Sequence, residues 1–272
     1  MAIQTAAGGN IAGVVPPEST LNFFSPAFEI IMNNTEQSGG ILYVVATPIG
    51  NLEDITQRAL RVLAEVDYIA AEDTRRTRQL LTHFNINAKL ISYHSFNEHQ
   101  KTDSICRDLA AGQCVAVVSD AGTPAVADPG FFIVRQAAEQ GIKVEIIPGV
   151  SALTFAASAA ALPVDRFAFY GFAPVKSGRK QKFFEEIAAE NKSIFFFESP
   201  YRVEKTLLLI EEIMGPERQV AIIREATKIH EEVIRGKISE INAANAQRQW
   251  KGEFVIGVAP ATSKNFSEEI DE

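Results

Sequence analysis

The feature that most constrains the fold is a regular alternation of short apolar runs with amphipathic segments, which begins at Ile41. Up to about residue 161, the apolar runs have the length of strands, and the segments between them show helical spacing. Strands that alternate with helices form a mostly parallel sheet with helices on both faces. We therefore predict five strands in the first half of the chain, over residues 41–46, 68–71, 89–92, 115–119 and 144–147.

Helices are predicted between these strands. Asp54 is a plausible N-cap for the first helix, whose apolar face runs from Ile55 to Val66, and Thr74 is a plausible N-cap for the second. The remaining helices of this half are expected over residues 98–111, 131–140 and 152–161.

The second half of the chain repeats the alternation less regularly. Strands are predicted at 167–171, 193–197, 220–224, 231–235 and 254–259, and helices at about 180–190, 203–214 and 238–247. Short links between the last strands indicate a mixed sheet, because close strand neighbours are usually antiparallel. The expected fold class is thus a two-domain α/β protein, with a mostly parallel N-terminal domain over residues 40–163 and a mixed α/β C-terminal domain over 164–260. The boundary is placed at Pro163, where a proline follows a helix.

Residues 1–39 contain paired glycines, prolines and asparagines without sustained periodicity, so we expect a disordered N-terminal extension. Met32 stands shortly before the first strand and is an alternative start, which predicts that residues 1–31 are dispensable. Residues 261–272 are expected to be a flexible tail.

Composition excludes several classes of protein. The formal net charge of −8 argues against coating nucleic acid by charge alone, although it permits a local basic patch. Cys106 and Cys114 are the two cysteines, too few for a disulfide framework, which favours a cytoplasmic protein. No apolar run approaches the roughly 20 residues of a membrane span, and we expect no contact with a membrane.

The candidate chemistry lies after the strands, because ligands of open α/β sheets bind at the carboxyl ends of the strands. These loops are rich in glycine, proline and small polar residues, whereas the turns at the opposite edge are plain. Glycine allows a close approach to a ligand and proline fixes the backbone, although a plain turn role is the simpler reading for any one loop. The loops are Thr47-Pro48-Ile49-Gly50-Asn51, Glu72-Asp73-Thr74-Arg75, Tyr93-His94-Ser95-Phe96-Asn97, Asp120-Ala121-Gly122-Thr123-Pro124 and Pro148-Gly149-Val150-Ser151-Ala152.

Common phosphate-binding signatures are missing from these loops. None matches GxGxxG or GxxxxGK[ST], so dinucleotide and nucleoside triphosphate chemistry are disfavoured. The four histidines lack a convincing ligand spacing, and we predict no metal site. A cofactor held by backbone groups and small side chains fits these loops better.

Four of these loops, those after the first, second, fourth and fifth strands, resemble motifs of the tetrapyrrole methylase superfamily and occur in the same order. The resemblance covers about Ile41 to Pro260 and includes further motifs: Asp128-Pro129-Gly130, Gly171-Phe172-Ala173-Pro174, Phe197-Glu198-Ser199-Pro200-Tyr201-Arg202, Arg224-Glu225-Ala226-Thr227-Lys228 and Gly252-Glu253-Phe254-Val255. Porphyrin and corrin methylases usually carry a GPG-type turn after the first strand. This chain has Thr47-Pro48-Ile49-Gly50 there, and so resembles the branch that methylates ribosomal RNA more closely.

The resemblance implies a homodimer that holds S-adenosyl-L-methionine in the cleft between its two domains. The implied reaction is 2′-O-methylation of a cytidine in the decoding region of 16S rRNA, with the small ribosomal subunit as partner. The cofactor-binding candidates are Pro48, Asp120, Gly122, Thr123, Pro124, Pro148, Gly149, Ser151, Ala152, Glu198 and Ser199.

Charged residues at strand ends supply candidates for catalysis and RNA binding. Methyl transfer to a hydroxyl needs alignment and removal of a proton. Glu72, Asp73 and Arg75 are the catalytic candidates, although Asp73 can instead pair with Arg75 or cap a helix. The substrate-binding candidates are Lys176, Arg179, Lys180, Arg224 and Lys228, with internal ion pairs as the alternative for the last two.

Two other functions stay open on sequence alone. The first alternative is a small-molecule methyltransferase of the tetrapyrrole or corrin type. The second is a ligand-binding module without catalysis.

Overall fold

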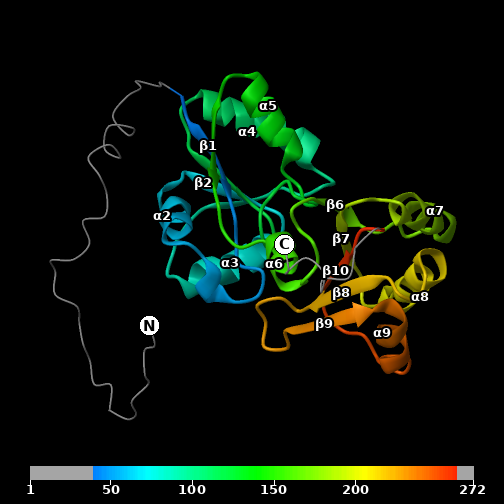
Figure 1. The fold of residues 1–272 in the computed structure, drawn as a ribbon. Coiled ribbons are helices and arrows are strands. Elements are labelled where there is room, and N and C mark those ends of the chain that lie inside the picture. The colour runs from blue at the N-terminus through cyan, green and yellow to red at the C-terminus, as the bar shows by residue number, and fades with distance from the viewer. Residues whose placement is uncertain (1–38, 262–272) are drawn as a thin grey trace, which may run out of the picture. The chain divides into compact units, whose positions relative to one another are not determined.

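The computed structural model describes residues 39–261, and all structural statements below concern this part of the chain. The predicted N-terminal extension, with the alternative start Met32, and the predicted tail lie almost wholly outside these residues. Figure 1 shows two sheets with their helices.

The first sheet is fully parallel and has the strand order β3-β2-β4-β1-β5. Its strands fall within two residues of the predicted limits, and the expected parallel sheet is confirmed. They are β1 (Ile41–Val45), β2 (Tyr68–Ala71), β3 (Leu90–Ser92), β4 (Val115–Val118) and β5 (Lys143–Ile147).

Helices cover both faces of this sheet (Figure 1). Alternate residues of β4 pack to opposite sides, because successive strand side chains point to opposite faces. Ala116 lies in a core with α2 (Gln57–Glu65) and α3 (Thr74–His83). Val117 lies in the other core, with α4 (Glu98–Ala110) and α5 (Phe131–Glu139). The continuous apolar run of β4 is therefore buried on both faces, as parallel strands are.

The N-caps of the first two helices differ from the prediction. Asp54 lies in a 3-10 turn, η1 (Leu52–Asp54), and the Thr56 hydroxyl caps α2 by accepting from the amide of Ala59. Asp73, rather than Thr74, caps α3 by accepting from the amide of Arg75 at 2.8 Å. Each helix has two nearby residues of the type that can cap an N-terminus. The backbone conformation of the turn before the helix decides which of them does so.

The second sheet is mixed, as predicted, with the order β6-β7-β10-β8-β9. β6 and β7 are parallel, whereas β10 runs antiparallel to both of its neighbours and β9 antiparallel to β8. The strands are β6 (Phe167–Phe172), β7 (Ser193–Glu198), β8 (Gln219–Arg224), β9 (Glu232–Lys237) and β10 (Phe254–Val258). One face packs against the helices α7 (Ser177–Ala188), α8 (Val203–Met214) and α9 (Ile238–Ala244).

The helix α6 (Ala152–Ala159) covers the other face of the second sheet. The predicted N-terminal domain includes this helix, yet Ala156 and Ala160 pack in one core with Phe195 and Val255 of the second sheet. Small side chains let the helix approach the sheet closely, which periodicity alone does not reveal. The domain limits at residues 163 and 164 stay a prediction.

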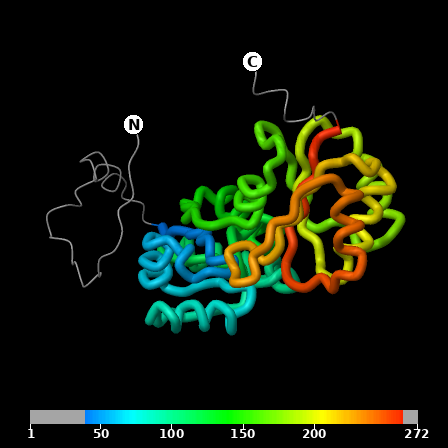
Figure 2. Tube along the Cα trace, turned by 60° about the horizontal axis from the view of Figure 1, so that its bottom comes forward, coloured from blue at the N-terminus to red at the C-terminus, as the bar shows by residue number. Residues whose placement is uncertain are grey.

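The loops after β1 and β8 meet, although they are far apart in sequence. The amide of Asn51 donates to the Thr227 hydroxyl at 3.1 Å, and Figure 2 shows the orange β8–β9 connection beside the blue segment that follows β1. A Cβ at Gly50 would lie 2.4 Å from the Lys228 side chain, so the contact needs glycine there. In residues 39–261, no helix combines the length and apolarity that a membrane crossing requires.

Candidate active site

A cavity of about 360 Å³ lies where loops of the first sheet face strand ends of the second. We call it the inter-sheet cavity. The loops after β1 and β4 and the start of α6 form one side, and β6, β7, β8 and β10 with their ends form the other. Its lining residues are Ile49, Ala121, Asp128, Ala152, Phe172, Phe197, Glu198, Ser199, Pro200, Ile223, Ala226, Gly252, Glu253, Phe254 and Val255.

The cavity has apolar walls and a few carboxylates. Phe172 and Phe197 pack edge to face with ring centroids 5.3 Å apart, and Ile223 adds an aliphatic surface. Asp128 reaches the cavity from the loop after β4. An apolar pocket of this size with few polar groups is typical of a small-molecule site.

The carboxylates of Glu72, Asp120 and Asp128 lie close together, after the end of β2 and in the loop that follows β4. The Glu72 carboxylate accepts from the amide of Asp120, and Asp120 accepts from the amide of Asp73 at 3.0 Å. Burial and the nearby charge of Glu72 raise the pKa of Asp128 to about 6. Burial also raises the pKa of Glu72. Asp128 can therefore take up a proton near neutral pH, which suits general base chemistry.

Asp73 and Arg75, two of the predicted catalytic residues, are paired with each other. The guanidinium of Arg75 donates to both carboxylate oxygens of Asp73, at 3.0 and 2.7 Å, and is largely exposed. Hydrogen bonds from Arg75 hold the pKa of Asp73 far below its usual range. Asp73 therefore fits the alternative role, an ion pair and helix cap, better than the role of catalytic base.

Glu198 is the centre of a buried ion-pair network in the wall of the cavity. Its carboxylate accepts from the ammonium of Lys180 at 2.8 Å, from the Thr206 hydroxyl at 2.6 Å and from Arg202 at 2.6 Å. The side chain of Lys180 is 8% exposed and that of Glu198 is fully buried. The prediction that Lys180 binds RNA is therefore wrong, because its charge faces Glu198 in the interior. Glu198 does line the cavity, beside the predicted Ser199.

Arg224 and Lys228 also make internal contacts. Arg224 donates to the carbonyls of Lys251 and His230, at 2.6 and 3.1 Å. The Lys228 ammonium lies 3.0 Å from Glu225 and 2.9 Å from Glu253. These contacts match the alternative of internal ion pairs for both side chains.

The two predicted cofactor loops contribute unequally to the cavity. Of the five residues from Pro148 to Ala152, Ala152 lines it, and the glycine turn Gly149 packs against Ala46 instead. In the other loop, Gly122 exchanges two backbone hydrogen bonds with Thr47, at 2.9 and 3.0 Å. These bonds hold Ala121 in the wall. Thr123, Pro124, Pro148 and Ser151 do not line the inter-sheet cavity, although Ser151 directly precedes the lining residue Ala152.

The loop between β4 and α5 is strained. Ala125 and Ala127 both adopt positive φ, at 68° and 63°, although neither is glycine. Such residues cost about 1–3 kcal/mol each and persist where the surrounding structure enforces them. Asp128 follows directly, so this strained loop positions the carboxyl that enters the cavity.

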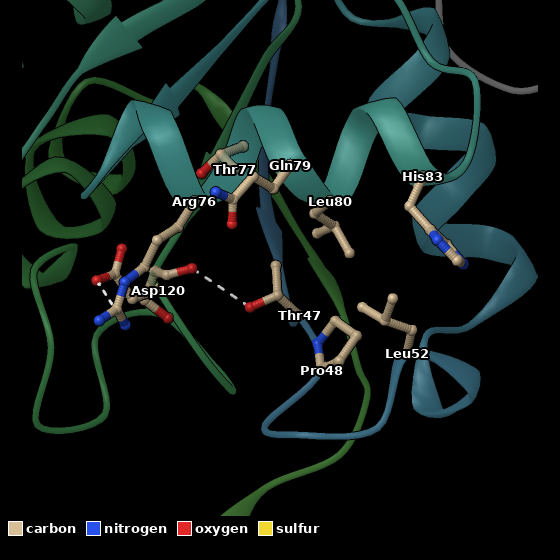
Figure 3. A pocket seen from close by; sticks show the side chains of 10 residues that line it. Thr47, Pro48, Leu52, Arg76, Thr77, Gln79, Leu80, His83 and Asp120 are labelled. Atoms are coloured by element: carbon tan, nitrogen blue, oxygen red, sulfur yellow. Dashed lines mark hydrogen bonds and ion pairs between the residues drawn. The ribbon is translucent and has the colours of Figure 1, made fainter.

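A second cavity of about 440 Å³ lies along α3 (Figure 3). Pro48 and Asp120, both predicted cofactor ligands, line it, whereas their neighbours Ile49 and Ala121 line the inter-sheet cavity. Arg76 extends over its rim and pairs with Asp120 at 3.3 Å. The other lining residues are Thr47, Leu52, Thr77, Gln79, Leu80, His83 and Ser119. The loops after β1 and β4 thus separate the cavity along α3 from the inter-sheet cavity.

Sequence reasoning omitted several lining residues from its candidates. Asp128 belongs to the Asp128-Pro129-Gly130 motif, and Gly252 to Val255 form another motif of the resemblance, so a signal existed for both. Phe172 and Phe197 also lie within motifs of the resemblance, yet neither was among the predicted cofactor ligands. Lys176 and Arg179, predicted to bind RNA, are exposed at the start of α7. No group of three or more His, Cys, Asp or Glu side chains within residues 39–261 could hold a metal ion.

Comparison with known proteins places this geometry in a family. The model of the Tetrapyrrole (Corrin/Porphyrin) Methylases matches residues 41–242. The chain belongs to the tetrapyrrole methylase family. Within it, the chain is 45% identical over 233 residues to ribosomal RNA small subunit methyltransferase I of Synechocystis sp., covering 85% of this chain and 84% of the relative. It is 46% identical over 225 residues to the protein of that name from Escherichia coli, covering 82% and 79%.

Several solved structures share the fold at low sequence identity. Uroporphyrin-III-C-methyltransferase from Thermus thermophilus superimposes with a TM-score of 0.56 at 19% identity, over 82% of this chain and 95% of that one. A structure of that Thermus enzyme complexed with S-adenyl homocysteine gives a TM-score of 0.56 at 17% identity, over 82% and 98%. Diphthine synthase gives 0.61 at 16% identity, over 81% and 89%. These likenesses establish the fold.

Proposed function

We propose that this protein transfers a methyl group from S-adenosyl-L-methionine to the RNA of the small ribosomal subunit. The observation that carries the proposal is the identity of about 45% to relatives named ribosomal RNA small subunit methyltransferase I, over more than three quarters of both chains. The exposed cations Lys176 and Arg179 and the acidic cluster at the cavity are consistent with it.

We place the cofactor in the inter-sheet cavity. Phe172, Phe197 and Ile223 offer the apolar surface that an adenine ring needs, and Asp128 offers a carboxylate toward a sulfonium cation. The donor set of this site therefore fits S-adenosylmethionine. When bound, the cofactor supplies an electrophilic methyl group. A solved protein of the same fold, complexed with S-adenyl homocysteine, supports this assignment.

The finer proposal is that the acceptor is the ribose 2′-hydroxyl of a cytidine in the decoding region of 16S rRNA. Its proton needs an acceptor near the methyl donor. Glu72 and Asp128, whose pKa values burial raises, fill that role better than Asp73, which Arg75 occupies. Asp120 positions Asp73 through its amide and restrains Arg76 at the rim of the neighbouring cavity.

Lys176 and Arg179 remain the proposed RNA contacts, since both are exposed, whereas Lys180, Arg224 and Lys228 are engaged internally. The homodimer and the cytoplasmic location are further parts of the proposal.

The test uses purified protein, S-adenosylmethionine with a labelled methyl group, and small ribosomal subunits from cells that lack the modification. We expect label in 16S rRNA at a position that resists alkaline cleavage, because 2′-O-methylation blocks the attacking hydroxyl. Uroporphyrinogen serves as the competing substrate. Label in the tetrapyrrole and none in RNA would overturn the proposal in favour of a small-molecule methylase, and cofactor binding without transfer to either would indicate a binding module.

A further inference from the structure

A third cavity, of about 570 Å³, adjoins the inter-sheet cavity and shares Pro200 and Gly252 with it. We call it the Tyr201 groove. It lies after the last residue of β7 and before the first residue of β10. Its lining residues are Pro200, Tyr201, Glu204, Lys205, Arg248, Gln249, Trp250, Lys251 and Gly252.

Strand pairing explains why these segments meet. β7 and β10 are antiparallel neighbours with Phe254 opposite Glu198, so the residues after β7 and before β10 lie at the same end of the sheet. Gly252 adopts a φ of +102°, and a Cβ there would lie 2.6 Å from the Glu225 side chain. Only glycine fits this position, which fixes the divide between the groove and the inter-sheet cavity.

The groove presents aromatic surface. Tyr201 is 93% exposed although its ring is large, and its amide faces the Ser199 hydroxyl at 3.4 Å. Trp250 lies deeper, at 9% exposed, with the Arg248 guanidinium 4.4 Å above its ring. Aromatic rings and guanidinium planes are the surfaces on which unpaired bases of RNA stack.

The charge of the groove is opposite to that of the whole protein. Lys205 and Lys251 are exposed and make no ion pair with any residue between 39 and 261. Arg248 pairs with Glu232, and Glu204 is the one carboxylate among the lining residues. Two unpaired cations beside an exposed ring therefore face solvent on a protein with a net charge of −8.

We propose that the Tyr201 groove binds one unpaired nucleotide of the RNA next to the nucleotide that is methylated. Its base stacks on Tyr201, and its phosphate lies between Lys205 and Lys251. The inference rests on the proposed function, because the adjoining cavity is the one assigned to the cofactor. Sequence-specific recognition of RNA mostly targets unpaired nucleotides whose bases stack on aromatic side chains, and the groove offers such a surface.

The experiment compares Tyr201→Ala with Tyr201→Phe, and the double variant Lys205→Gln/Lys251→Gln with the control Lys192→Gln. Lys192 is at the opposite end of β7, before its first residue. We measure three quantities: the KM for unmodified small subunits, the Kd for a labelled single-stranded RNA of the target sequence, and the Kd for S-adenosylmethionine.

We expect Tyr201→Ala to raise both RNA constants about tenfold or more, the usual effect of losing one stacked base. Tyr201→Phe should keep wild-type values because it retains the ring. The double lysine variant should flatten the salt dependence by about 0.7 in the logarithmic slope for each lost phosphate contact. Cofactor affinity should not change in any variant.

The failures of the two proposals can be distinguished. Wild-type KM and RNA Kd in Tyr201→Ala and in the double variant would overturn the groove assignment and leave the proposed function intact. A wild-type protein that does not methylate subunits overturns the proposed function. The RNA Kd then decides the groove alone, and it stands if Tyr201→Ala weakens binding while Tyr201→Phe does not.

Discussion

Replacing Glu198 with glutamine tests the buried network in the wall of the cavity. The substitution preserves size but removes the charge that faces Lys180, whose side chain is 8% exposed. A buried ammonium without its carboxylate costs about 3–5 kcal/mol. For a folded region of this size, each kcal/mol lowers Tm by about 2–4 °C, so we expect a loss of roughly 6–20 °C.

The assay is thermal and urea unfolding of a double-mutant cycle. Lys180→Met should cost less than Glu198→Gln, because Arg202 still faces the remaining carboxylate at 2.6 Å. The double variant should be more stable than the sum of the single effects by about 1–3 kcal/mol, since no uncompensated charge is left between the pair. Glu186→Gln on the exposed face of α7 is the matched control, and its pair with Lys182 is worth less than about 1 kcal/mol.

A Glu198→Gln variant within about 0.5 kcal/mol of wild type would refute this reasoning, as would single effects that simply add. The first result would mean that the Lys180 ammonium is stable in the interior without the Glu198 charge. The second would mean that Lys180 and Glu198 act on stability through different partners.

Three further predictions concern the site. Gly122→Val forces a branched side chain into a φ of +83° and should abolish cofactor binding in calorimetry, whereas Gly141→Val, with a φ of +71° in the α5–β5 turn, should retain it. Because the pKa of Asp128 is raised to about 6, the folded state loses stability as pH rises from about 4 through 6, by about 1–2 kcal/mol after solvent screening of this half-buried carboxyl is counted. Asp128→Asn should remove this loss, and equal urea midpoints for variant and wild type at pH 8 would contradict it. Reversing the charges of Lys176 and Arg179 should raise the KM for small subunits and flatten its salt dependence without changing cofactor affinity, and normal methylation across salt would exclude this cluster.

The strands could be predicted from the sequence because their signal is local. The run from Val115 to Val118 is apolar throughout, and such a run suits a strand buried on both faces. The loops after the strands could be selected because a parallel sheet brings all its carboxyl ends to one edge.

Long-range partners could not be read from the sequence. Lys176 and Lys180 are four residues apart, a spacing that would place both on one face of a continuous helix. Lys176 instead precedes α7 as its extended N-cap residue and stays exposed, whereas Lys180 lies inside the helix and pairs with Glu198. The sequence of the alanine-rich α6 does not indicate which of the two sheets the helix packs against. Predicting the residues of the cavity walls requires the strand order, in which β10 lies between β7 and β8. Local sequence patterns do not encode that order.

Because the inter-sheet cavity takes its walls from both sheets, a ligand held there binds only when both are in place. Such a ligand stabilises the folded state by RT ln(1 + [L]/Kd), which is about 2.7 kcal/mol at a hundredfold excess over Kd. Opening of either half would release the ligand and expose chain to proteases. Resistance to proteolysis would therefore follow the concentration of free cofactor, so that a cell depleted of its methyl donor would hold less of this protein.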